Sequence, residues 1–144
     1  MNRRPLFTLI AAVVAAFVAS SLWYSPLIFG RQFLELSGAD LHPDHAGAKV
    51  AGEILRNVVL AGVVARLILL LNPSGWKQVL GLGGLLWIGF PVLLLSGSVM
   101  WQSVPWMLAL IHAGDWFVKL LLMAAILGSA HKPPAIKTLA RHPA

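Results

Sequence analysis

Three ionisable residues lie at helical spacing within one long apolar stretch of this sequence. His112, Asp115 and Lys119 follow one another at i, i+3 and i+7 inside residues 104–130, which places them on one face of a helix. Imidazole and carboxylate groups so placed could exchange protons, and Asp115 could pair with the lysine one turn later. Because a charge at the centre of a bilayer costs ~3 to more than ~10 kcal/mol, ionisable residues at that depth indicate a function by default.

The partners of this helical face are expected on another apolar stretch, residues 50–71. It carries Arg56 and Asn57 side by side, and Asp115 could reach them if the two helices pack together. Cations outnumber carboxylates within the apolar stretches, which favours a small anionic or carbonyl-bearing ligand over a metal ion. We therefore expect no metal and no cofactor, and a binding site or proton pathway formed by Arg56, Asn57, His112, Asp115 and Lys119.

Two other charges of residues 50–71 are set aside because of their depth. At ~1.5 Å of rise per residue, Glu53 lies ~5 Å from the expected outer end, which suits an interfacial position. Arg66 lies ~24 Å deep, where its long side chain can snorkel to the headgroups of the inner side. We expect neither residue to belong to the site.

These residues leave three functions open. The first is small-solute or proton-linked transport, or ligand binding, through the polar cluster. The second is a structural or assembly role in which the buried charges only fix helix packing. The third is a membrane-embedded enzyme acting on a lipid-like substrate, with His112 as general base oriented by Asp115. The enzyme is disfavoured, and no catalytic residue is assigned, because the sequence has no serine elbow and no zinc-type motif.

The composition defines the elements that must position these residues. The chain has 144 residues, of which 58% are hydrophobic and 11% charged, and its mean hydropathy is +0.80. A water-soluble fold of this size could not bury so much apolar surface. Four apolar blocks reach the ~20 residues that a helix needs to cross a bilayer. We predict an all-α membrane protein with one domain, residues 1–132, whose four transmembrane helices form a bundle over about 6–29, 50–71, 79–100 and 104–130.

The basic residues predict the orientation of this bundle. Six lie on the side of the two termini, at Arg3, Arg4, Lys77, Lys132, Lys137 and Arg141, whereas the outer loop, residues 30–49, has only Arg31 and Lys49. By the positive-inside rule, both termini are cytoplasmic in a multi-pass protein of the cell's inner (plasma) membrane. The net charge of +6 therefore indicates lipid headgroups as partners, not nucleic acid. Residues 133–144 form a short basic tail.

Small residues in the first span predict close helix packing. They recur every fourth residue in two rows, Ala11/Ala15/Ala19 and Ala12/Ala16/Ser20, and small side chains let helix backbones approach within lipid. The neighbour could lie in the same chain or in another protomer. Together with the small size of the chain, these rows lead us to expect a homo-oligomer.

Several local signals predict breaks and turns. Pro26 should kink or end the first span, and Pro91 should bend the third. Residues 33–36 could form a short interfacial turn that ends at Gly38. Histidines and an aspartate at residues 42–45 offer metal ligands, but the intervening proline makes a solvated loop the preferred interpretation.

Three short segments together resemble a known family. They are Trp-Tyr-Ser-Pro-Leu-Ile-Phe-Gly at residues 23–30, the pair Gly89-Phe90, and Ile-His-Ala-Gly-Asp-Trp at residues 111–116. Over essentially the whole chain, the sequence resembles the small bacterial four-span membrane proteins of the domain-of-unknown-function family seventeen-sixty-one. The resemblance implies an integral membrane protein, and it carries no established activity and no site residue. Small multidrug exporters match less well, because their first span holds a glutamate and this one has no acid.

Overall fold

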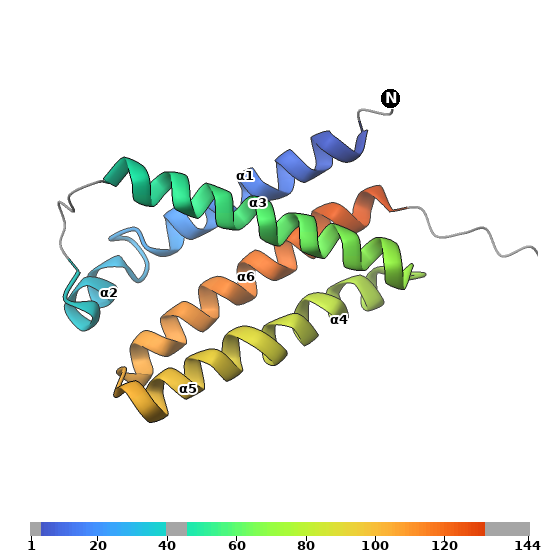
Figure 1. The fold of residues 1–144 in the computed structure, drawn as a ribbon. Helices are drawn as coiled ribbons and strands as arrows, with labels where there is room; N and C mark the ends of the chain where they lie inside the picture. Colours follow the sequence, from blue (N-terminus) through green and yellow to red (C-terminus); the bar gives the residue numbers. More distant parts are fainter. Residues whose placement is uncertain (1–3, 40–45, 132–144) are drawn as a thin grey trace, which may run out of the picture.

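The computed structural model describes residues 4–39 and 46–131. These residues form helices throughout (Figure 1), in the order α1 (Arg4–Trp23), α2 (Gly30–Ser37), α3 (Ala46–Leu71), α4 (Trp76–Trp87), the π-helical turn η1 (Ile88–Val92), α5 (Leu93–Gln102) and α6 (Trp106–Ala130). Four stretches are long and apolar enough to cross a membrane, namely Leu6–Trp23, Gly47–Leu71, Trp76–Gln102 and Trp106–Ala130. The prediction of an all-α chain with four candidate membrane spans is confirmed.

Helix α6 is the centre of the arrangement. It packs against α1, α3 and α4, and also against the shorter α2 and α5. In its most apolar window 44% of the residues are buried, compared with 17–22% in the other three candidate spans. Those three spans keep most of their apolar side chains on the outside, which suits helices surrounded by lipid. The described ends nearest the two termini lie at one end of the bundle, and α2 lies at the other (Figure 1).

One of the two small-residue rows of α1 forms part of the core. Ala12 and Ala16 are completely buried and Ser20 is 7% exposed. The two alanines belong to one apolar cluster with Val64 of α3 and Met123 of α6. The neighbours of this row are therefore helices of the same chain, and the row is already occupied without a second protomer.

The prediction that the first span continues to residue 29 is wrong. Helix α1 ends at Trp23, because Pro26 cannot continue the helix and the chain turns tightly, with the Gly30 amide donating to the Ser25 carbonyl at 2.9 Å. A side chain at residue 30 would meet the Tyr24 carbonyl oxygen, so the turn requires glycine. The turn expected at residues 33–36 lies within helix α2, whose C-terminal cap is Gly38 in the left-handed conformation (φ 63°), as predicted.

The remaining boundaries differ little from the predicted ones. Helix α3 begins at Ala46, so the predicted outer loop, residues 30–49, is shorter than expected and contains α2. Pro91 lies inside η1, where the wider π-helical turn accommodates its missing N–H, and α5 continues directly from there. The histidine-rich residues 42–45 and the tail, residues 133–144, lie outside the described residues.

Candidate functional site

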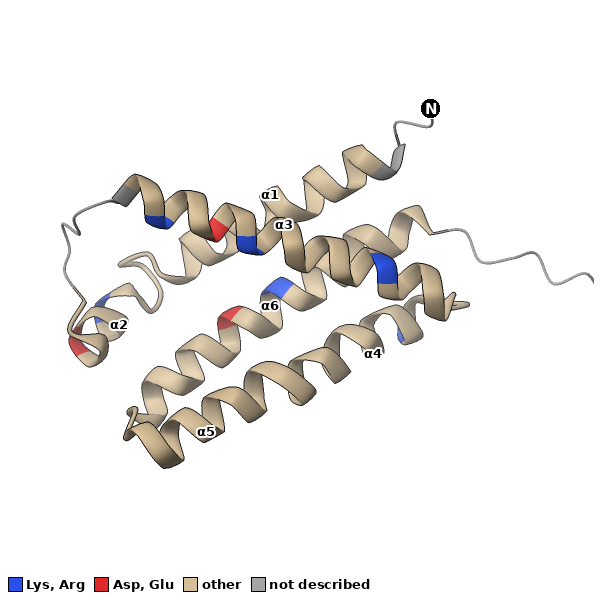
Figure 2. Cartoon of the chain, viewed as in Figure 1, with Lys and Arg blue, Asp and Glu red and all other residues tan. Residues whose placement is uncertain are grey.

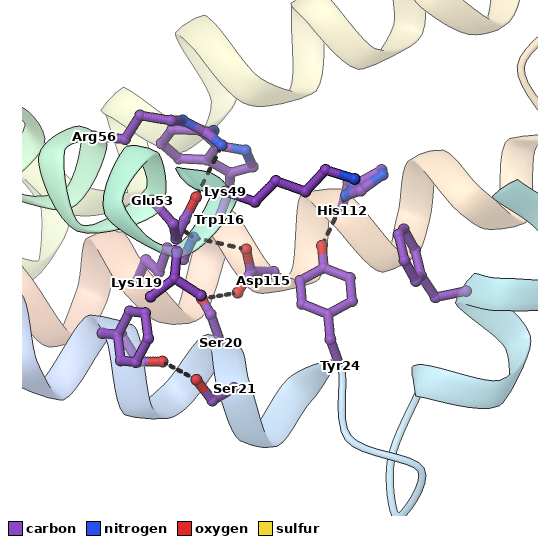
Figure 3. A pocket seen from close by; sticks show the side chains of 13 residues that line it. Ser20, Ser21, Tyr24, Lys49, Glu53, Arg56, His112, Asp115, Trp116 and Lys119 are labelled. Carbon is purple, nitrogen blue, oxygen red and sulfur yellow. Dashed lines mark hydrogen bonds and ion pairs between the residues drawn. The ribbon is translucent and has the colours of Figure 1, made fainter. Parts of the chain in front are cut away.

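The charged residues of the candidate spans lie mainly on α3 and α6, and α5 has none (Figure 2). Five of them border a cavity of about 560 Å³ at the end of the bundle where α1 ends and α3 begins, namely Lys49, Glu53, Arg56, Asp115 and Lys119. Side chains from α1, α3 and α6 converge on it (Figure 3). Its polar lining consists of Ser20, Ser21, Tyr24, Lys49, Glu53, Arg56, His112, Asp115 and Lys119.

A continuous series of polar contacts crosses this cavity. Lys119 Nζ lies 3.0 Å from Asp115 Oδ2, which confirms the predicted pair one helical turn apart, and 2.7 Å from Glu53 Oε1. The Ser20 hydroxyl donates to Asp115 Oδ1 at 2.5 Å. Arg56 Nη1 donates to Glu53 Oε2 at 2.9 Å. These contacts join α1, α6 and α3, and the side chains of Lys119 and Asp115 are only 5% and 6% exposed.

Two sequence-based expectations about this network are wrong. Glu53 was expected to be an interfacial residue outside the site, yet it is the carboxylate that links α3 to Lys119. Asp115 was expected to reach Arg56, but it contacts Ser20 and Lys119, and Arg56 pairs with Glu53 instead. The two side chains differ in their position around the axis of α3: Glu53 lies on the side that faces α6, whereas the side chain of Arg56 is 62% exposed.

Asn57 is the predicted site residue that does not line the cavity. It is 2% exposed in the interior, and within residues 4–39 and 46–131 its Nδ2 has no hydrogen-bond partner. The other four predicted residues, Arg56, His112, Asp115 and Lys119, all line the cavity.

The indole ring of Trp116 lies close to both cations of the network. Lys119 Nζ lies 5.6 Å from the ring centroid and Arg56 Cζ lies 5.7 Å from it, within the range of cation–π attraction. The ring therefore holds Arg56 beside the cavity although that side chain is largely exposed.

His112 is held by aromatic residues instead of by Asp115. Its Nδ1 shares a hydrogen bond of 2.7 Å with the Tyr24 hydroxyl, and Phe33 of α2 packs edge-on against the imidazole at 5.7 Å. Burial raises the pKa of Tyr24 above its ordinary value, and the carboxylate of Asp115 raises it further, so the phenol stays neutral. In the described part of the chain no hydrogen bond joins His112 to Asp115, whose carboxylate accepts from Ser20.

A close fit between α1 and α6 sets the position of these groups. Trp23 Nε1 donates to the Ile111 carbonyl at 3.0 Å. Gly114 makes room for the indole, since a Cβ there would lie 2.5 Å from Trp23 Cζ2. From the opposite side, Trp87 of α4 donates to the Ala113 carbonyl at 2.7 Å.

The polar lining residues that sequence reasoning missed are Ser20, Ser21, Tyr24, Lys49 and Glu53. Tyr24 was considered as part of the segment that carries the family resemblance, and Ser20 as a small packing residue. The signal that could have identified Ser20 and Tyr24 is their i, i+4 spacing, which places both polar groups on one side at the end of α1, where the Tyr24 amide still donates to the Ser20 carbonyl at 3.0 Å.

The cavity lining combines cationic and anionic side chains. Within the described ranges, no group of three or more His, Cys, Asp or Glu side chains could hold a metal ion. Ser96 and Ser98 donate to carbonyls of their own helical turn, at 2.8 and 3.2 Å. The cavity instead presents three cationic and two anionic side chains, an excess of one positive charge when His112 is neutral.

The chain belongs to the family described as protein of unknown function (DUF1761), whose model matches residues 7–128. The resemblance inferred from the three short segments is therefore confirmed. No curated protein and no solved structure shows a significant match to the chain.

Proposed function

We propose that this protein binds a small anionic or carbonyl-bearing solute in the cavity between α1, α3 and α6, and that binding serves proton-linked transport. The observation that carries the proposal is the charge of the cavity. The three cationic side chains Lys49, Arg56 and Lys119 outnumber the two carboxylates Glu53 and Asp115. One negative charge on a ligand would therefore bring the net charge of the cavity to zero. A cation would meet repulsion there.

The expected orientation places this cavity on the outer side of the inner membrane. The end of the bundle that holds α2 carries few basic residues, and both termini belong to the basic side. Beyond Lys119 the interior is apolar, formed by residues such as Val64, Leu120 and Met123. This layer supports a site that is reached from one end only and must rearrange to release its ligand at the other.

Proton coupling would use the contacts of Asp115. A proton on this carboxyl group would weaken its ion pair with Lys119, which lies 3.0 Å away, and leave the ammonium available to a ligand anion. His112 lines the same cavity, and imidazole is a common proton carrier in proteins. Ligand binding and proton uptake would then favour each other.

A structural role is the second candidate, and a specific observation favours it. The polar series from Ser20 through Asp115 and Lys119 to Glu53 joins three helices. Asp115 and Lys119 are 5% and 4% exposed, and groups so buried can fix helix register without any ligand.

The two candidates differ in the expected behaviour of Asp115→Asn. Transport predicts that wild-type proteoliposomes take up pyruvate, a singly charged carbonyl compound, faster under an inward proton gradient. Asp115→Asn should abolish the gradient effect while the protein still folds, and the control Arg66→Gln, outside the cavity lining, should retain it. A gradient effect that survives in Asp115→Asn would refute the proton link. If wild type neither binds nor moves pyruvate and Asp115→Asn only lowers thermal stability, the structural role is supported.

A further inference from the structure

Arg56 is exposed at a depth where an arginine needs acceptors. It follows Gly47, the first residue of the candidate span, by nine positions, which corresponds to ~14 Å along the helix. Its side chain is 62% exposed. Of the five N–H donors of a guanidinium, described residues accept one, through Glu53 Oε2. Hydrocarbon cannot satisfy the others, so these donors are available to a molecule that brings acceptors to this depth.

An apolar groove begins beside this guanidinium. It has a volume of about 430 Å³ and runs between α3 and the segment from α4 to α5, over α6. Leu60, one turn beyond Arg56 on α3, lines it together with Phe90 and Leu94. Trp116 lines both this groove and the polar cavity, and its ring carries the Arg56 guanidinium. The polar and apolar spaces therefore adjoin at one residue pair.

We propose that the ligand is a membrane-dissolved amphiphile of the fatty-acid type, with one acyl chain and a singly charged anionic head. This inference rests on the proposed function and names its substrate class. The carboxylate accepts hydrogen bonds from Arg56 in the bidentate geometry that guanidinium groups favour, and it supplies the single negative charge that the cavity lacks. The acyl chain lies in the groove against Trp116, Phe90 and Leu94. Both spaces fall within the ~300–1,000 Å³ typical of ligand sites.

The head group must determine the selectivity of such a site. An acyl chain gains no hydrophobic free energy when it moves from lipid into an apolar groove. A neutral ester with the same chain should therefore not bind in the groove in preference to the bilayer. The comparison of an acid with its methyl ester isolates the contribution of Arg56.

A photoreactive fatty acid with a diazirine at mid-chain tests the proposal in the full-length protein, reconstituted in phosphatidylcholine vesicles. Mass spectrometry of the labelled peptides should locate crosslinks at the groove residues Leu60, Phe90 and Leu94, and not at Val14, which is 54% exposed on α1. Excess palmitate should reduce groove labelling at least tenfold, and methyl palmitate should leave it unchanged. Arg56→Gln should also reduce it about tenfold, whereas the control Arg66→Gln should label like wild type.

A second variant keeps the test decisive if Arg56→Gln fails to fold. Leu94→Trp fills the groove from its lipid-exposed side and should abolish groove labelling while pyruvate binding in the cavity persists. Labelling spread evenly over all exposed helix faces, or unchanged in Leu94→Trp and Arg56→Gln, overturns the inference. Pyruvate binding without groove labelling in wild type overturns the inference alone, and loss of both in a folded wild-type protein overturns the proposed function as well.

Discussion

Replacing Lys119 by methionine should destabilise the protein by ~3 kcal/mol. The substitution keeps an unbranched stem but removes the ammonium that lies 2.7 Å from Glu53 and 3.0 Å from Asp115. Removing one partner of a buried ion pair costs ~3–5 kcal/mol, because the other charge stays buried without a partner. We expect the lower end of this range, since Ser20 still donates to Asp115 and Arg56 still pairs with Glu53.

The assay is equilibrium unfolding in mixed micelles, followed by tryptophan fluorescence. The double variant Lys119→Met/Asp115→Asn provides the control, because it removes both charges of the pair and leaves an amide that can still accept from Ser20. It should recover at least ~1 kcal/mol relative to Lys119→Met alone, within the usual range of coupling energies. A loss below ~1 kcal/mol in Lys119→Met, typical of a solvent-exposed ion pair, would refute the interpretation of Lys119 as a buried bridge.

Two further predictions concern packing and orientation. Gly114→Ala places a methyl group 2.5 Å from the Trp23 ring and should cost ~1–3 kcal/mol in the same unfolding assay. In the control Gly62→Ala, the new methyl group meets no neighbouring atom within 4 Å. This substitution should leave the free energy of unfolding unchanged or raise it by up to ~1 kcal/mol. Equal losses of stability in Gly114→Ala and Gly62→Ala would contradict the proposed fit. The chain has no cysteine, so Ser37→Cys and Ser74→Cys report topology cleanly. In intact cells a membrane-impermeant maleimide should label only Ser37→Cys, and the opposite pattern would reverse the orientation.

The sequence predicts the candidate spans because length and apolarity suffice to identify them. It predicts the ends less well, as the first span shows. The apolar run continues to residue 29, but α1 ends at Trp23. Hydropathy alone overestimates the length of this helix, because it is insensitive to backbone geometry. The expectation that Pro26 would kink or end the first span is confirmed, and the turn that follows requires glycine at Gly30.

The site is less predictable because depth along a helix says nothing about rotation around it. Glu53 was excluded by depth alone, and Arg56 and Asn57 were treated as a pair because they are adjacent. Adjacent helical residues point in different directions; Asn57 is 2% exposed and the side chain of Arg56 is 62% exposed. The i, i+4 spacing of Glu53 and Asn57 was the better guide, since it places both on the side of α3 that faces the interior.

Partners from α1 could not be predicted, because the sequence does not say which spans are neighbours. Tyr24 and His112 are 88 residues apart, and Ser20 and Asp115 are 95 apart. Only the fold brings these pairs together. The i, i+4 pair of Asp115 and Lys119 was predictable because it lies within one helix.

The segments that carry the family resemblance form much of the interface between α1 and α6. Among the described residues, three hydrogen bonds join α1 and the turn after it to α6, and they link Ser20 to Asp115, Trp23 to the Ile111 carbonyl, and Tyr24 to His112. Rotation of α6 would break all three, so this interface keeps its register without the ion pair to α3. Among the described residues, Lys119 and Glu53 form the only ion pair between α6 and α3. We infer that a ligand anion competing for Lys119 would loosen α3 while α1 and α6 stay together, which makes α3 the helix expected to move.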